Sequence, residues 1–75
     1  MPTQKYRFAF RTDAGEVVTV LHDTRPGDAE NCARKMARLV AKKKNARDVT
    51  CIWYGPEGDP KTMKLLAQSR KEAGA

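Results

Sequence analysis

The sequence has few of the residues from which catalytic and metal sites are built. It contains two cysteines and one histidine, and Cys32, Cys51 and His22 do not show the spacing of metal ligands. No second titratable group stands at motif spacing from His22, and no glycine-rich loop opens a helix. We therefore expect no enzyme activity, no cofactor and no metal. The cysteines are expected to be buried, reduced thiols, with a structural disulfide as the alternative.

Long apolar runs are also missing. The start, MPTQKYRFAF, lacks the apolar core of a signal peptide, and no stretch approaches the ~18 apolar residues of a membrane span. We therefore expect a cytoplasmic protein without a membrane partner. The 75 residues are expected to form a single domain over 1–75. Its structured core would cover roughly residues 4–68, with residues 70–75 frayed.

Two segments near the start have the pattern of paired strands. Residues 5–12 alternate between aromatic and basic side chains, which is typical of a half-buried strand. Residues 16–22 are rich in β-branched side chains. Between them, residues 13–15 (Asp-Ala-Gly) suit a three-residue hairpin loop with the glycine in a left-handed conformation. This loop turns Phe8 and Phe10 toward one pair of valines in the second segment, whereas a two-residue loop would turn them toward the other pair.

The middle of the chain predicts one long amphipathic helix. Pro26-Gly27 marks a turn, Asp28 is a good N-cap, and the helix is expected to end between Lys42 and Asn45. Apolar residues at helical spacing would line its buried side: Ala29, Cys32, Ala33, Met36, Ala37, Leu39 and Val40.

Two further elements are expected after this helix. Residues 48–54 predict a third strand, with Val49, Cys51 and Trp53 on one face and Thr50, Ile52 and Tyr54 on the other. Asp59-Pro60 then predicts the start of a second helix, because it pairs an N-cap with proline at the first helical position. The weak apolar edge of that helix would consist of Met63, Leu66 and Ala67.

The predicted fold class is α+β, a small single domain with the order β-β-α-β-α. We expect a three-stranded, mainly antiparallel sheet in the order 2-1-3, with the long helix packed on one face. The aromatic residues of the first strand favour that strand as the central one. The alternative places the third strand beside the second, as a parallel pair with a right-handed crossover. The face of the sheet that the second helix covers stays open.

Positive charge gathers on the outer side of the long helix. Fifteen Lys and Arg against nine Asp and Glu give a formal net charge of +6, which favours a polyanionic or acidic partner. Like charges four residues apart cost an isolated helix about 0.2–0.5 kcal/mol per pair, and only Glu30 is placed to offset them. The candidate binding residues are Arg34, Lys35, Arg38 and Lys42, with Lys43, Lys44 and Arg47 extending the charge past the helix end.

A second candidate surface is the face of the sheet opposite the long helix. It would combine three cations with one aromatic side chain: Lys5, Arg7, Arg11 and Tyr54. Single-stranded nucleic acids bind such surfaces by stacking and by backbone charge. The second helix would compete for the same face.

We expect a small, basic, non-enzymatic binding protein that contacts the phosphates of DNA or RNA through the basic helix face. The alternative is an inhibitor or adaptor, of the kind that phages and mobile elements encode. Such a protein would bind an acidic surface of a larger protein or ribonucleoprotein complex. An open sheet edge would also allow two copies to pair as a homodimer. A solvated helix face without a binding role is the remaining interpretation.

Overall fold

Three strands and two helices follow the predicted order in the computed structural model, which describes residues 2–74 and the side chains of residues 2–71. The elements are β1 (Gln4–Thr12), β2 (Val17–Thr24), η1 (a short 3-10 helix, Pro26–Asp28), α1 (Ala29–Lys44), β3 (Val49–Pro56) and α2 (Pro60–Gly74). The second helix is longer than the sequence suggested, since it continues to Gly74.

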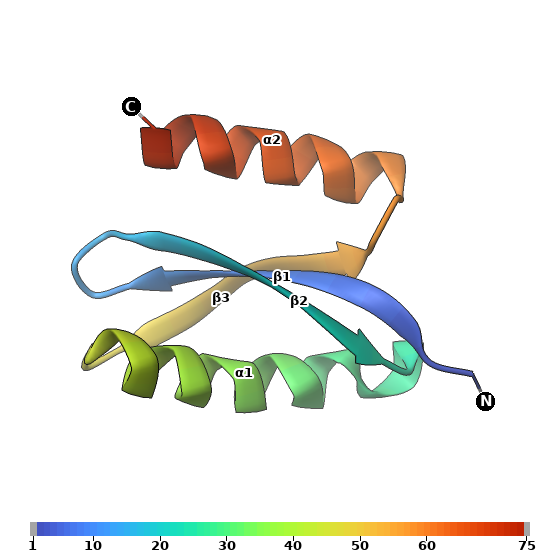
Figure 1. The fold of residues 1–75 in the computed structure, drawn as a ribbon, viewed down its shortest axis with the longest axis horizontal. Helices are drawn as coiled ribbons and strands as arrows, with labels where there is room; N and C mark the ends of the chain where they lie inside the picture. Colours follow the sequence, from blue (N-terminus) through green and yellow to red (C-terminus); the bar gives the residue numbers. More distant parts are fainter. Residues whose placement is uncertain (1, 75) are drawn as a thin grey trace.

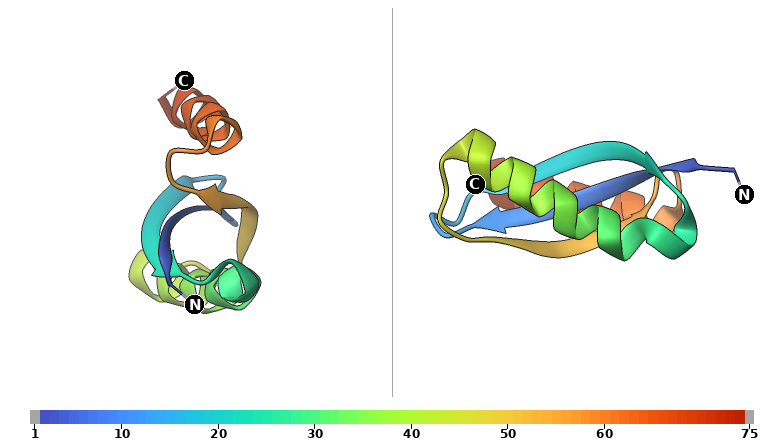
Figure 2. Two further views of the ribbon diagram at one scale, coloured as in Figure 1. Left: turned by 90° about the vertical axis from the view of Figure 1, so that its right-hand side faces the viewer. Right: turned by 90° about the horizontal axis from the view of Figure 1, so that it is seen from below.

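The sheet has the predicted topology. Its order is β2-β1-β3, and β1 pairs antiparallel with both neighbours. The predicted α+β fold with β1 in the centre is therefore confirmed. Figure 1 shows α1 on one face of the sheet and α2 on the other, and the end-on view in Figure 2 shows the same three layers. The second helix thus covers the face that the sequence left open.

The hairpin between β1 and β2 is confirmed in detail. Phe8 lies opposite Val20 and Phe10 opposite Val18, as the three-residue loop requires. The Thr12 amide donates to the Glu16 carbonyl at 2.9 Å. Gly15 adopts a φ of 85°, which only glycine takes up at low cost.

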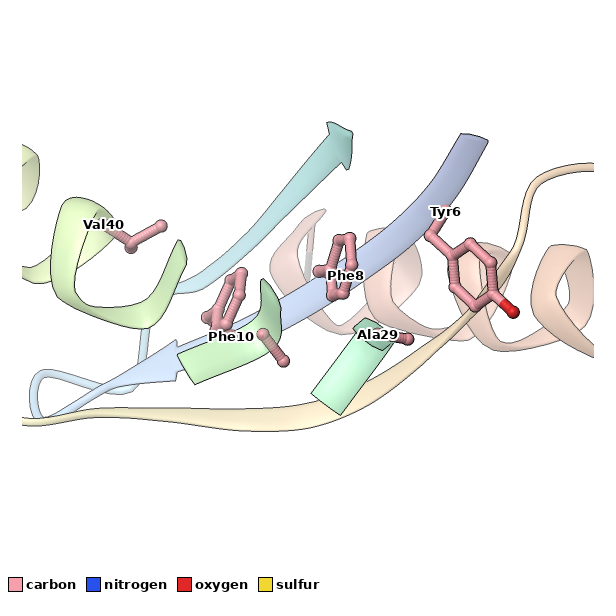
Figure 3. Packing of buried hydrophobic residues seen from close by; sticks show 6 residues of the cluster. Tyr6, Phe8, Phe10, Ala29 and Val40 are labelled. Carbon is pink, nitrogen blue, oxygen red and sulfur yellow. The ribbon is translucent and has the colours of Figure 1, made fainter. Parts of the chain in front are cut away.

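The core lies between β1 and α1. Phe8 and Phe10 are fully buried, and Tyr6 is nearly so. The helix contributes small or branched side chains to the same cluster, among them Ala29 and Val40 (Figure 3). Because alanine is small, the helix can lie close to the aromatic side chains of β1.

The ends of α1 confirm the predicted boundaries. Asp28 occupies the N-cap position, although its side chain makes no capping hydrogen bond. Asn45 ends the helix in the left-handed region with a φ of 53°. The Ala46 amide donates to the Ala41 carbonyl at 2.9 Å, which is the hydrogen bond of a Schellman ending.

The prediction for the two faces of β3 was wrong beyond Cys51. Phe10 pairs with Cys51 and Ala9 with Trp53, so Ile52 is left as the extra residue of a β-bulge. A bulge reverses the alternation of side chains. Trp53 therefore faces α2, where its indole Nε1 donates to the Ser69 Oγ at 2.9 Å.

Three predictions about helix faces were also wrong. Leu39 is 59% exposed, because it lies at the margin of the buried arc of α1, where no strand covers it. Met63 and Ala67 are exposed as well. Of the predicted apolar edge of α2 only Leu66 is buried, and the polar residues Thr62 and Ser69 are buried beside it. Both cysteines are free thiols. They were expected to be buried, but both are only half-buried.

Candidate functional site

The predicted basic residues of α1 lie on the side of the helix that faces away from the sheet. The buried residues of α1 hold one side of the helix against the strands. The exposed side of α1, which is the lower helix in Figure 1, therefore carries four cations: Arg34, Lys35, Arg38 and Lys42. We call these four residues the α1 basic stripe.

Acidic side chains compensate only part of this charge. Arg34 donates to the Glu30 carboxylate at 3.3 Å, and both side chains are more than two-thirds exposed, so the pair is weak. Lys44, beyond the stripe, pairs with Glu16 at 3.2 Å. Among the side chains of residues 2–71, no ion pair involves Arg38 or Lys42. These two cations are the least compensated part of the stripe.

The remaining cations of this region differ in their surroundings. Lys35 borders a hollow that also contains Asp23 and Asp28, so acidic groups stand near the first half of the stripe. Lys43 and Arg47 are exposed. They extend the uncompensated charge toward the C-terminal end of α1, as the sequence predicted.

The second candidate surface is not assembled. Arg7 is held by Glu57, with its Nε 2.7 Å from the carboxylate, and Arg11 borders a hollow that contains Asp13 and Asp48. Tyr54 lies on the opposite face, because the bulge turns it toward α1, where its ring stacks on Phe8 with the centroids 5.9 Å apart. The side chains of α2 cover much of the remaining face. Lys5 is exposed but stands without the predicted aromatic neighbour.

A second basic helix surface was missed. The outer side of α2 carries Lys61, Lys64 and Lys71, all exposed, on the face of the molecule opposite the α1 basic stripe. The absence of any acidic residue between positions 60 and 71 is the signal that could have found it. This surface provides a matched reference for the α1 basic stripe, because it carries similar charge on the same fold.

A groove of about 650 Å³ runs between α1 and the outer edge of β3. Ala33 and Ala37 form its helix side, and Cys51 and Tyr54 lie on its strand side. Burial raises the pKa of the Cys51 thiol above its ordinary value of 9.0, and a backbone hydrogen bond with Trp53 offsets part of this shift. The thiol is therefore protonated at neutral pH and is a poor nucleophile.

Neither helix, over the described residues 2–74, is long and apolar enough to cross a membrane. Within the same part of the chain, no three His, Cys, Asp or Glu side chains gather as metal ligands would. Comparisons of this chain with protein-family models, curated proteins and solved structures found no match. The class that the fold and the surface define is a small α+β domain with a basic helix on each face of its sheet.

Proposed function

We propose that the protein binds the phosphate backbone of a nucleic acid through the α1 basic stripe. The observation that carries the proposal is the pair Arg38 and Lys42, exposed one helical turn apart without an acidic partner among the described side chains. A guanidinium holds a phosphate with two hydrogen bonds, and a lysine adds a point charge beside it. Such contacts read no base sequence, so we expect weak discrimination between sequences.

The charge arrangement supports the proposal because it lowers the stability of α1. Arg34, Arg38 and Lys42 stand at four-residue intervals, where like charges destabilise a helix. An acidic residue at position 38 would remove this repulsion. A surface that only keeps the protein in solution does not need three cations in one row, whereas phosphate binding does.

The test is nucleic-acid binding across a salt series, for example by fluorescence anisotropy with labelled duplex and single strands. We expect the affinity of the native chain to fall steeply as salt rises. Replacing Lys35, Arg38 and Lys42 together by Gln should reduce the steepness of the log–log salt dependence by about 3, one unit per lost phosphate contact.

The matched control replaces Lys61, Lys64 and Lys71 by Gln. This variant has the same net charge as the α1 triple variant but keeps the α1 basic stripe intact, so it separates a local contact from a general effect of net charge. Equal losses in both triple variants would contradict the proposal, as would binding of the native chain that does not depend on salt.

Leu39 favours a second candidate, a protein partner with an acidic surface. Its side chain is 59% exposed beside the α1 basic stripe, and a phosphate backbone has no use for an apolar contact there. Capture of one protein from a nuclease-treated lysate, sensitive to Leu39→Gln, would favour this candidate over nucleic acid.

A further inference from the structure

The two open edges of the sheet differ in their protection. β2 and β3 each pair only with β1, so each has one edge without a neighbouring strand. Proteins guard such edges with charged residues, above all lysine, because an unguarded edge pairs with other strands. The β2 edge has this protection, since Lys43 and Lys44 border the groove beside it. β3 itself contains no charged residue, and the charged side chains beside its edge, Glu30 and Arg34, belong to α1 and pair with each other. The bulge at Ile52 and the terminal Pro56 limit regular pairing along this edge to short segments on either side of Ile52.

The β3 edge also has space beside it. The groove between this edge and α1 measures about 650 Å³, against about 450 Å³ for the groove beside β2. The side of the groove formed by α1 carries the short side chains of Ala33 and Ala37, which leaves room for the side chains of an added strand. The chemistry of the groove is mainly apolar, with Cys51 and Tyr54 at its base.

Backbone groups of β3 are available for pairing. The Asp13 amide donates to the Asp48 carbonyl at 2.9 Å and the Glu57 amide to the Lys5 carbonyl at 2.8 Å, which fixes the two ends of the β1–β3 ladder. Antiparallel ladders alternate between residues that hydrogen-bond inward and residues that point outward. Counting from both ends, the outward residues on either side of the bulge are Val49, Cys51 and Tyr54.

We propose that this edge binds a second copy of the same chain, β3 against β3 and antiparallel about a two-fold axis. The two sheets would then form one sheet of six strands. The charges beside the groove favour a second copy of this chain as the partner. Glu30 and Arg34 both line the groove, are highly exposed and pair with each other at 3.3 Å, so a two-fold axis that passes between them would let Glu30 of each copy pair with Arg34 of the other. An isologous interface requires this kind of self-complementarity.

Two of the remaining cations of α1 lie away from the proposed interface. Lys35 and Lys43 border hollows on the β2 side of the helix, away from the proposed interface. Both copies of α1 would lie on the same face of the joined sheet, so the dimer would present the remaining stripe residues of both copies, Lys35, Arg38 and Lys42, on one face. This consequence rests on the proposed function, because it doubles the surface that contacts phosphates.

The test measures the mass of the full-length chain by sedimentation over a range of concentrations. We expect the mass to double from 8.4 kDa as the concentration rises. Thr50→Lys places a guarding lysine on the exposed β3 edge and should raise the dimer dissociation constant by at least about tenfold. Thr19→Lys places a lysine on the other edge strand, β2, at a half-buried position whose side chain lies on the same face of the sheet, and should leave the dimer unchanged.

A second pair of variants tests the exchange of charges. Glu30→Arg should weaken the dimer, and the double variant Glu30→Arg/Arg34→Glu should restore it. Circular dichroism and urea unfolding of each variant show whether it is folded. A native chain that stays monomeric up to roughly 1 mM, or equal effects of Thr50→Lys and Thr19→Lys, would overturn the proposal. In that case the open β3 edge would instead be expected to pair with an extended segment of another protein.

Salt separates this proposal from the proposed function. Salt screens both the Glu30–Arg34 pairs between copies and the repulsion between two chains that each carry a formal charge of +6, so these two effects offset each other and the dimer should depend only weakly on salt. Phosphate binding should weaken as salt rises. A monomer that binds nucleic acid overturns only the dimer, and a dimer that binds none overturns only the phosphate surface.

Discussion

At the scale of single residues, Gly55 of the sheet lies directly against Thr62 of α2. A side chain at this position would overlap the Thr62 Oγ1 and contact the Thr62 Cβ and Cγ2. Thr62 is itself buried, so it has little room to move aside. Gly55→Ala should therefore lower the free energy of unfolding by about 1–3 kcal/mol, measured by urea denaturation.

Two variants make this prediction specific. Gly27→Ala is the control, because nothing lies within 4 Å of the position where its Cβ would be, and its φ is not positive. It should leave stability unchanged or raise it by about 0.4–1 kcal/mol. Adding Thr62→Ala to Gly55→Ala should recover part of the loss, since it removes the hydroxyl that the new methyl group meets. Additive losses in this pair would show that the two side chains do not compete for space.

At the scale of elements, α2 is held to the sheet by an unusual set of contacts. Its buried side consists of Leu66 between two polar residues, Thr62 and Ser69. The Ser69 hydroxyl accepts the hydrogen bond of the Trp53 indole at 2.9 Å. Ser69→Ala should cost about 1 kcal/mol, because it leaves the indole N–H without its partner.

The single tryptophan of the chain reports this contact directly. We expect Ser69→Ala to shift its fluorescence emission along with the loss in stability. Gln68→Ala, at the neighbouring exposed position of α2, should change stability by less than about 0.5 kcal/mol and leave the emission unchanged. A Ser69→Ala variant with native stability and emission would show that this hydrogen bond contributes nothing to holding α2 against the sheet.

The elements that could be predicted from the sequence are those with a local chemical signal. Gly15 marks the hairpin loop, Asp59-Pro60 marks the start of α2, and Asn45 ends α1 in a left-handed conformation. The central position of β1 followed from its aromatic side chains, which need cover on one face. The cations of α1 were placed on its outer side by helical spacing alone.

The parts that could not be predicted depend on contacts between distant residues. No glycine or proline marks the bulge at Ile52, so the alternation of β3 was continued past Cys51 and both Trp53 and Tyr54 were assigned to the wrong faces. The buried side of α2 was missed for a related reason. Thr62 and Ser69 are polar, and they are buried only because Gly55 and Trp53 lie opposite them.

At the scale of the whole molecule, the α1 basic stripe lowers the stability of the fold while it provides the proposed phosphate-binding surface. Arg38 has a cation one turn before it and another one turn after it, so Arg38→Glu would replace two repulsive pairs by two attractive ones. We expect this variant to gain about 0.5–1 kcal/mol in the free energy of unfolding. The same variant should lose nucleic-acid affinity, because it removes one phosphate contact and places an anion in the middle of the stripe.

Lys64→Glu changes the net charge by the same amount on α2, where no cation stands four residues away on either side. It should lose less affinity and gain less stability than Arg38→Glu. Urea unfolding and anisotropy on the same two preparations measure both quantities. If the row of cations binds phosphate, Arg38→Glu should raise the free energy of unfolding and lower the affinity for nucleic acid. A gain in stability with unchanged affinity would instead mean that the row is solvated surface and that no phosphate is bound there.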